Sequence, residues 1–313
     1  MHVVFVGGGG TVGSTAAYSL ACERPDVEIS LCDVDGDAAW GHATDLRHAR
    51  CHAGHALGTA SVAGEVSSVE PGPAAVAGAD CVVVTASVPR PPAGGERGGR
   101  DTYWPANGEL ADEIAGWLAE TDPCPVLAVT NPVDRVLARL HEGTGWPRER
   151  FVGYSLSETA RVADAIARRL DVDPATVDCP VLGEHGEHIV PAFSRATVGG
   201  SPLELSADAR QAVTEYARSI PYDVIQKRGG TDSSRWVTGR GTALIVEALL
   251  GAEPAGPVCL STPLAGEYGI EDVALGVPVV LSAAGVEKIV EWDLAPAERE
   301  ALETAARAVA EAT

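Results

Sequence analysis

The sequence has little lysine and no long apolar run. Lys227 and Lys288 are its two lysines, and 44 Asp and Glu residues stand against 23 Lys and Arg residues, for a net charge of −21. A surface of this charge repels phosphates, so we expect neither a nucleic-acid partner nor association with anionic membranes. No run of about eighteen apolar residues occurs, so the sequence also predicts no membrane-spanning helix.

The seven cysteines are scattered, odd in number and without a Cys-x-x-Cys pair. A disulfide framework or a cysteine-based zinc site would show paired, closely spaced cysteines. Residues 1–6 pass directly into an apolar run and lack the charged start and the cleavage site of a signal peptide. We therefore expect a cytoplasmic protein with reduced cysteines.

The excess of acidic residues has two explanations. The negative surface repels itself at low salt, and salt screens that repulsion over a Debye length of about 10 Å at 0.1 M and about 3 Å at 1 M. A cytoplasm rich in salt would therefore suit this chain. Alternatively, a GC-rich genome replaces lysine by arginine through codon bias, and the protein is an ordinary acidic enzyme.

A length of 313 residues, of which 45% are hydrophobic, predicts two domains. The first half alternates strand-like and helical patterns, which is typical of a doubly wound α/β domain. Its expected strands are residues 3–6, 27–32, 81–85 and 126–130, and its expected helices are residues 12–21 and 38–49. The second half predicts an α+β substrate domain, with helices at 158–170, 207–227, 241–250 and 296–312 and strands at 177–182 and 277–281. We place the division between residues 1–145 and 146–313.

A glycine-rich turn joins the first expected strand to the first expected helix. Gly8, Gly10 and Gly13, with Thr11 and Val12 between the last two, form a G-x-G-x-x-G pattern. Such glycines permit a tight turn and let a pyrophosphate rest on the helix N-terminus, so the context predicts a Rossmann doubly wound parallel sheet.

Asp33 lies 20 residues after Gly13, at the end of the second expected strand. A carboxylate at this place accepts hydrogen bonds from ribose hydroxyls and repels a 2′-phosphate, which favours NAD over NADP. The alternative is a glycine-rich turn followed by an Asp that caps a helix.

His185 lies between two glycines and two acidic residues, directly after an apolar run. The unperturbed pKa of histidine is about 6.5, so this side chain is suited to shuttle a proton near neutral pH. The alternative is a solvated loop histidine.

Polar residues follow two further expected elements. Asn131 comes directly after the strand at 126–130, where ligands of open α/β sheets bind, although it could also be a turn residue before Pro132. Arg161 follows Glu158 by three residues on an expected helix, a spacing that also produces ordinary surface ion pairs.

Three arginines, Arg90, Arg97 and Arg100, lie in a loop rich in glycine and proline at residues 89–100. This composition is typical of a mobile lid with charged side chains, and equally of a solvated surface loop.

Together these motifs resemble the lactate/malate dehydrogenase family, and more closely its malate-type, haloarchaeal-like members. The resemblance extends over nearly the whole chain. It includes the glycine turn, Asp33, Pro89-Arg90, Asn107, residues 130–134, Arg161, residues 182–186 and, near the C-terminus, residues 266–269, 276–278 and 285–289.

The resemblance implies a role for each matching residue. His185 would take the substrate hydroxyl proton, oriented by Glu158, and Arg161 would hold the substrate carboxylate as a bidentate fork. Arg100 would polarise the C2 oxygen, and Arg90 would pair with a second carboxylate, which points to malate and oxaloacetate rather than lactate.

The resemblance also implies NAD as the cofactor. Asn131 would bind the substrate, while Asn107 and Thr130 would lie beside NAD. Members of this family form dimers or tetramers, so we expect a homo-oligomer with a small 2-hydroxy or 2-oxo acid as substrate.

The chain departs from the family pattern at its loop. Arg100 follows Arg90 by ten positions, about four more than usual. Arg100 is preferred as the lid arginine because Asn107 follows it by seven residues, the family spacing, and Arg97 remains the alternative. The longer loop leaves open a substrate such as L-lactate or another 2-hydroxy acid.

Two further departures lie in the second half. Glu158 stands where the family has Asp, and the segment before it is one residue short, which leaves open an NAD-binding paralogue without turnover. The segment at residues 229–240 is about three residues longer than usual, and Thr231 or Ser234 in it could contact the substrate.

A metal site is the remaining alternative. His48, Cys51, His52 and His55 are closely spaced, and spacings of three and four can place ligands on one helix face. The stretch at residues 45–49, however, resembles a family helix that packs between subunits, so we expect no metal.

Overall fold

The N-terminal half forms a parallel sheet. The computed structural model describes residues 1–54, 64–89, 96–97, 99–229, 234–252 and 256–312. The strand order is β3-β2-β1-β4-β5-β6, all parallel, as expected for a Rossmann fold. The strands are β1 (His2–Val6), β2 (Glu28–Cys32), β3 (Val66–Val69), β4 (Cys81–Val84), β5 (Val126–Ala128) and β6 (Phe151–Gly153).

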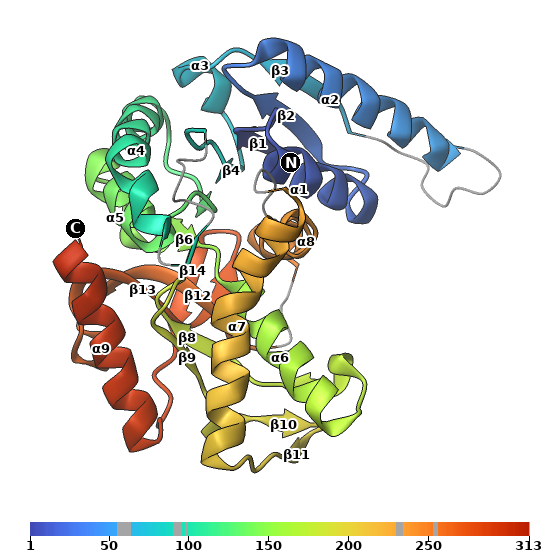
Figure 1. The fold of residues 1–313 in the computed structure, drawn as a ribbon. Helices are drawn as coiled ribbons and strands as arrows, with labels where there is room; N and C mark the ends of the chain where they lie inside the picture. Colours follow the sequence, from blue (N-terminus) through green and yellow to red (C-terminus); the bar gives the residue numbers. More distant parts are fainter. Residues whose placement is uncertain (55–63, 90–95, 98, 230–233, 253–255, 313) are drawn as a thin grey trace.

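Helices cover both faces of this sheet because its central strands are apolar on both sides. In β1, Val3 and Phe5 pack into one core with helices α1, α2 and α8, while Val4 and Val6 pack into a second core with α3, α4 and α5 (Figure 1). The helices are α1 (Thr11–Glu23), α2 (Gly36–Arg50), α3 (Pro73–Val76), α4 (Trp104–Ala119), α5 (Val133–Thr144) and α8 (Arg235–Leu249). The predicted doubly wound α/β fold is therefore confirmed.

The sheet continues into the C-terminal half through antiparallel strands. β12 pairs with β6 at Ser261 and Gly153, and the order then runs β13, β8, β9, with β14 also on β13. These strands are β8 (Val181–Gly183), β9 (Ile189–Pro191), β12 (Val258–Ala265), β13 (Glu271–Ser282) and β14 (Gly285–Ile289). A separate three-stranded sheet contains β7 (Val177–Asp178), β10 (Thr197–Val198) and β11 (Ser201–Pro202).

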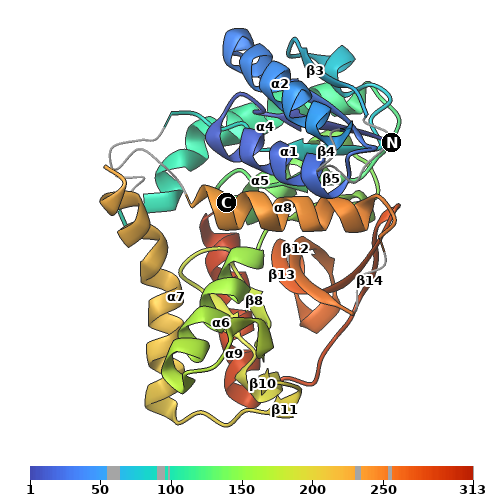
Figure 2. The ribbon, with the colours of Figure 1, turned by 90° about the vertical axis from the view of Figure 1, so that its right-hand side faces the viewer.

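The helices of the second half are α6 (Leu156–Leu170), α7 (Ala207–Lys227) and α9 (Pro296–Ala312). Figure 2 shows α8 running between the two halves, above α6 and beside α1, with α7 along one side. Short 3₁₀ helices complete the described chain: η1 (Cys51–Gly54), η3 (Gly99–Tyr103), η4 (Arg148–Arg150), η5 (Pro174–Thr176), η6 (Phe193–Arg195) and η7 (Glu267–Gly269).

One expected strand is wrong. Residues 177–182 were expected to be continuous, but β7 and β8 belong to different sheets. Pro180 lies between them and has no N–H for a sheet ladder, which explains the interruption. The parallel sheet also includes β6, which lies after the expected domain division at residue 145.

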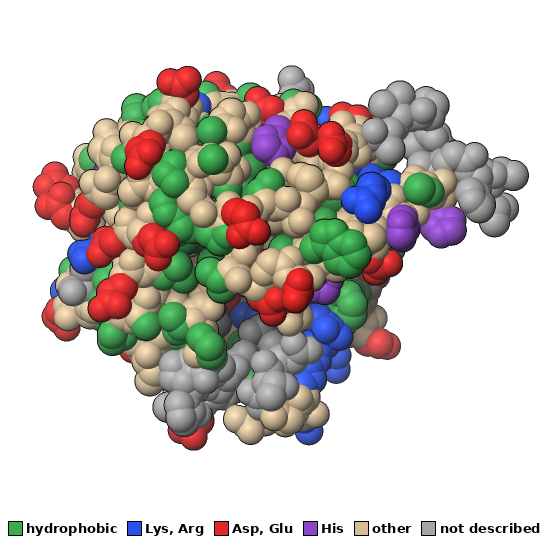
Figure 3. All heavy atoms as spheres, turned by 90° about the horizontal axis from the view of Figure 1, so that it is seen from above, with side chains coloured by type: hydrophobic (Ala, Val, Ile, Leu, Met, Phe, Trp, Pro, Cys, Tyr) green, Lys and Arg blue, Asp and Glu red, His purple; other side chains and the backbone are tan. Residues whose placement is uncertain are grey.

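Figure 3 shows acidic side chains spread over much of the face that carries α2 and β3, while basic side chains and histidines gather toward the side on which α2 ends. In the part of the chain that the structure describes, no helix is both long enough and apolar enough to cross a bilayer.

Candidate active site

The glycine turn after β1 and the carboxylate of Asp33 form one wall of a cavity of about 470 Å³. The main-chain N–H of Gly9 donates to Asp33 Oδ2 (2.9 Å), and the N–H of Asp35 donates to Oδ1 (3.0 Å). Both bonds hold the carboxylate in a defined orientation beside the turn. The cavity lies at the carboxyl ends of β1, β2 and β4, the place where α/β sheets bind nucleotides.

The predicted glycines divide into two roles. Gly10 lines the cavity together with Thr11, Val12 and Asp33. Gly13 instead permits close packing, because a Cβ there would lie 2.3 Å from the carbonyl oxygen of Gly7. Gly8 acts in the same way: a Cβ there would lie 2.8 Å from Leu31 Cβ. These residues fit a dinucleotide, since an open turn at a helix N-terminus accommodates a pyrophosphate and Asp33 faces the same cavity.

A second cavity, of about 150 Å³, lies at the ends of β4 and β5 between the two halves of the chain. Val12, Thr85, Ser87 and Tyr103 line both cavities, so the two adjoin. The smaller cavity is further lined by the predicted residues Thr130, Asn131, Arg161, Ser234 and His185.

His185 lies in the tight loop between β8 and β9. This loop is closed by the N–H of Glu184, which donates to the carbonyl of His188 (3.3 Å), and by the N–H of His188, which donates to Glu184 Oε2 (3.0 Å). The left-handed backbone of Gly183 (φ +92°) starts the loop, and a Cβ there would lie 2.4 Å from the oxygen of His188. The flanking glycine is therefore required by the turn that presents the histidine.

Glu158 contacts both His185 and Arg161. Its Oε2 lies 2.9 Å from His185 Nδ1, and its Oε1 accepts a hydrogen bond from Arg161 Nη1 (2.9 Å). Glu158 lies in the first turn of α6, and one turn of helix places Arg161 on the same side. The side chains of Glu158 and His185 are 4% and 7% exposed, so their close contact is shielded from water. The glutamate at position 158 therefore reaches the histidine.

Asp134 supports the histidine from behind. Its Oδ2 accepts a hydrogen bond from the main-chain N–H of His185 (2.9 Å). Burial raises the pKa of Asp134 to about 7, and the negative charges of Glu184 and Glu158 add to the rise. The Ser261 hydroxyl and the His185 N–H act in the opposite direction. Asp134 was part of a recognised motif, but the sequence alone assigned it no role.

Asn131 lines the smaller cavity and carries an unsatisfied buried polar atom. Its side-chain Oδ1 is buried and has no hydrogen-bond partner within the described part of the chain. Buried amide oxygens are rarely left unpaired, so this atom is suited to a bound ligand. Asn131 therefore lies where a substrate or nicotinamide contact was expected.

Asn107 lines neither cavity, whereas Thr130 lines the smaller one. Asn107 is 1% exposed; its Nδ2 donates to the carbonyl of Asn131 (2.7 Å), and its Oδ1 accepts from the N–H of Val88 (2.9 Å). Thr130 Oγ1 donates to the carbonyl of Ala86 (2.7 Å). The structure thus places Asn107 behind the cavity, where it joins the chain segments after β4 and β5.

The structure describes the three loop arginines to different extents. Arg90 lies outside the described residues, and for Arg100 the structure describes the backbone in η3. Arg97 is described and forms ion pairs with Glu187 and Glu215 rather than lining either cavity. Thr231 also lies outside the described residues, whereas Ser234 lines the smaller cavity.

Sequence reasoning missed part of the cavity wall. Tyr154 and Ser157 line it, with the Tyr154 hydroxyl donating to the carbonyl of Val237 (3.0 Å) and paired with Ser157 Oγ (2.8 Å). The Tyr154 ring meets the His185 ring edge-on, with centroids 6.0 Å apart. Burial raises the pKa of Tyr154, so its hydroxyl stays protonated. A tyrosine directly after an apolar strand was the available signal.

The histidine cluster that begins in α2 and η1 is described only in part. His55 lies outside the described residues, and among those described no group of three His, Cys, Asp or Glu side chains is arranged to hold a metal ion.

A dinucleotide cavity that adjoins a buried carboxylate–histidine pair and an arginine provides what hydride transfer to a nicotinamide requires. The fold and the site together define a nicotinamide-dependent dehydrogenase.

Comparisons with known proteins name the family. Residues 1–153 match the family model of the lactate/malate dehydrogenase NAD binding domain, and residues 158–312 match its alpha/beta C-terminal domain. The chain therefore belongs to the lactate/malate dehydrogenase family, and NAD is its cofactor.

Individual relatives with similar sequences or structures are malate and lactate dehydrogenases. The malate dehydrogenase of Halobacterium salinarum is 35% identical over 97% of this chain and 95% of its own length. The L-lactate dehydrogenase of Salinibacter ruber is 34% identical over 98% and 95%. The solved malate dehydrogenase of Aeropyrum pernix is 28% identical with a TM-score of 0.86, covering 100% of this chain and 97% of that one.

Proposed function

We propose that the protein oxidises (S)-malate to oxaloacetate with NAD, and catalyses the reverse reaction. The observation that carries this proposal is the contact of Glu158 with both His185 and Arg161 in a cavity that adjoins the cofactor cavity. Residues 1–145 would supply most of the cofactor site, and residues 146–313 most of the substrate chemistry.

The contact of His185 with Glu158 determines which imidazole nitrogen takes the substrate proton. Nδ1 of His185 faces Glu158, so Nε2 is the nitrogen that takes the proton from the C2 hydroxyl as the C2–H bond breaks. Glu158 stabilises the imidazolium that forms, and the same proton returns to the C2 oxygen during reduction. NAD supplies the acceptor for the hydride when it is bound.

Substrate binding is assigned to arginines and an amide. Arg161 holds the C1 carboxylate, with its guanidinium oriented by Glu158. Asn131 offers its unpaired Oδ1 at the cavity wall. Arg100 polarises the C2 oxygen, and Arg90 pairs with the second carboxylate of malate, an assignment that rests on the sequence.

The choice of malate over lactate is supported by the malate dehydrogenases among the relatives and by Arg90. L-Lactate is the second candidate, because one relative of similar identity is an L-lactate dehydrogenase and the loop that carries Arg90 is long.

Arg90→Gln distinguishes the two candidates. The loss of a desolvated charge pair costs on the order of 2–5 kcal/mol, so kcat/KM for oxaloacetate should fall by about 30-fold or more while that for pyruvate changes little. An equal change for both substrates would contradict the malate assignment.

We also propose a cytoplasmic homo-oligomer, a tetramer or a dimer, adapted to a salt-rich cell. Helices α1, α2 and α8 pack together and expose Tyr18 (55%), Trp40 (63%) and Trp236 (60%). Several large apolar side chains exposed on neighbouring helices are typical of a subunit interface. Analytical ultracentrifugation of the wild type and of Trp236→Glu tests this: the variant should shift toward smaller species.

A further inference from the structure

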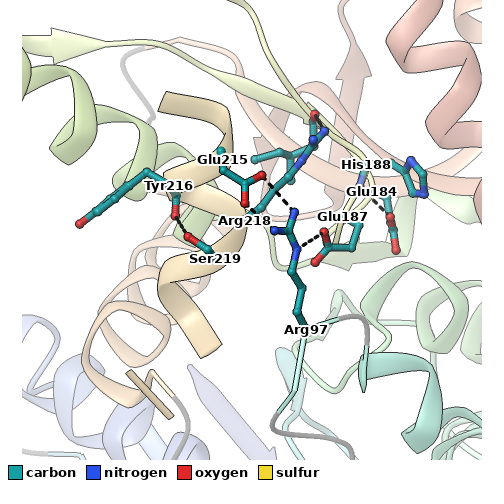
Figure 4. Close-up of polar contacts among 9 residues, drawn as sticks. Arg97, Glu184, Glu187, His188, Glu215, Tyr216, Arg218 and Ser219 are labelled. Atoms are coloured by element: carbon teal, nitrogen blue, oxygen red, sulfur yellow. Dashed lines mark hydrogen bonds and ion pairs between the residues drawn. The ribbon is translucent and has the colours of Figure 1, made fainter. Parts of the chain in front are cut away.

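Arg97 joins three separate parts of the chain. Its Nε donates to Glu187 Oε2 (3.0 Å), while its Nη1 and Nη2 donate to Glu215 Oε1 (2.5 Å) and Oε2 (3.1 Å). Figure 4 shows the guanidinium directed between the two carboxylates, one from the loop after His185 and one from α7. The contact with Glu215 has the bidentate geometry in which Arg binds carboxylates most specifically.

Both carboxylates belong to elements that form the substrate cavity. Glu187 lies two residues after His185 in the same tight loop. Glu215 lies on α7, whose later turns contribute Pro221, Tyr222 and Ile225 to the cavity wall. An ion-paired Arg97 therefore ties its own segment to two walls of the cavity.

Arg97 itself is not among the described residues that line the cavity, and its side chain is 45% exposed. All three of its donor-bearing nitrogens are used by the two carboxylates. The Arg97 contact lowers the pKa of Glu215, so this pair is charged at neutral pH. Two residues later, η3 begins at Gly99 and contains the backbone of Arg100.

We propose that Arg97 is a positioning residue. Its ion pairs with Glu187 and Glu215, called the clasp below, hold the start of η3 against α7 and the loop of His185, while Arg100 acts on the substrate. This inference rests on the proposed function. It separates the two loop arginines by task, with Arg97 setting substrate affinity and Arg100 stabilising charge on the C2 oxygen.

The expected change in KM on removal of Arg97 follows from the partial exposure of its ion pairs. Partly exposed ion pairs contribute little each, and salt screens them. We therefore expect removal of the clasp to raise KM about 3- to 10-fold, whereas loss of an oxygen-polarising group lowers kcat by about 100-fold or more. The two roles are thus separable by kinetics.

The experiment compares Arg97→Gln with Arg139→Gln. Arg139 makes a similar exposed pair with Asp112 (2.7 and 3.1 Å), joining α5 to α4, and its side chain is also 45% exposed. With oxaloacetate and NADH, Arg97→Gln should raise KM with kcat within about two-fold, and Arg139→Gln should match the wild type. The double variant Arg97→Glu with Glu215→Arg should recover part of the lost affinity.

A second readout does not depend on turnover. Amide hydrogen exchange in the NADH complex should be faster at Gly99–Tyr103 in Arg97→Gln than in Arg139→Gln, because the clasp holds η3 in place.

Three results would overturn the proposal. A kcat loss of about 100-fold or more that the charge-reversed pair does not rescue would make Arg97 the group on the C2 oxygen. Kinetics and exchange equal to those of Arg139→Gln would show that the clasp has no role. Faster exchange with an unchanged KM would show that the clasp does not contribute to substrate binding.

A wild type inactive on 2-oxo acids would refute the proposed function, and hydrogen exchange would then test the clasp alone.

Discussion

The carboxylate of Glu158 lies 2.9 Å from Nδ1 of His185 through one oxygen and 2.9 Å from Nη1 of Arg161 through the other. One buried side chain thus contacts both the proposed proton acceptor and the arginine proposed to bind the substrate carboxylate.

Glu158→Asp and Glu158→Gln should impair catalysis in different ways. The shorter Asp cannot reach both partners without movement of α6, so we expect KM for oxaloacetate to rise about 10-fold or more. Gln keeps the length but loses the charge that stabilises the imidazolium, so kcat should fall by about 10² to 10⁴. Steady-state kinetics of both variants provide the measurement, and an Asp variant equal to the wild type would contradict the bridging role.

His185→Asn tests whether the site is catalytic. The histidine lies in the substrate cavity rather than among the described residues of the cofactor cavity, so NADH should bind with nearly unchanged affinity. The rate should fall by about 10² to 10⁴, because general acid–base catalysis is lost. Fluorescence titration with NADH and steady-state rates measure the two effects. Full activity in this variant would remove His185 from the mechanism.

Asp134→Asn should change how stability depends on pH. Burial raises the pKa of Asp134 to about 7, so between about pH 4 and pH 7 the folded protein holds a proton that the unfolded chain releases. The wild type therefore loses stability as pH rises through this window, and the variant does not. Urea unfolding at several pH values should show the variant gaining stability relative to the wild type as pH rises from 4 to about 7.

Glu267→Gln is the matched control of opposite sign. A hydrogen bond from Arg148 holds the pKa of Glu267 at about 2, so its stabilising contribution is lost as pH falls from about 4.5 toward 2. This variant should gain stability relative to the wild type only in that acidic window. Parallel pH profiles for the two variants would show that neither carboxylate titrates as described.

The net charge of −21 predicts salt-dependent stability. Repulsion among the acidic residues is screened as the Debye length shrinks from about 10 Å at 0.1 M to about 3 Å at 1 M salt. The free energy of unfolding, measured by urea denaturation, should therefore rise with KCl across this range. Stability that stays constant or falls would favour the alternative of an acidic protein from a GC-rich genome.

Local sequence patterns predicted where the glycine turn, Asp33 and α7 lie in the fold. The G-x-G-x-x-G turn and Asp33 lie on one cavity, and α7 spans residues 207–227 as expected, because these features depend on neighbours in sequence. The continuous apolar strands of β1 and β4 were also recognisable, since both of their faces are buried.

The features that sequence patterns did not predict depend on contacts between residues far apart in the chain. β6 and β12 meet at Gly153 and Ser261, a pairing between segments far apart in the chain that no local periodicity reveals. The contact of Asp134 with the N–H of His185 and the ion pairs of Arg97 likewise join remote elements. For Asn107, sequence spacing identified the residue, but only the fold shows that it faces the main chain of Asn131.

The most direct test is the initial rate of NADH oxidation by the wild type with oxaloacetate and, separately, with pyruvate, in dilute buffer and in molar KCl. An enzyme specific for malate and oxaloacetate should show a kcat/KM for oxaloacetate far above that for pyruvate at either salt concentration. A preference for pyruvate, or no turnover of either acid by protein that binds NADH, would contradict the proposed function.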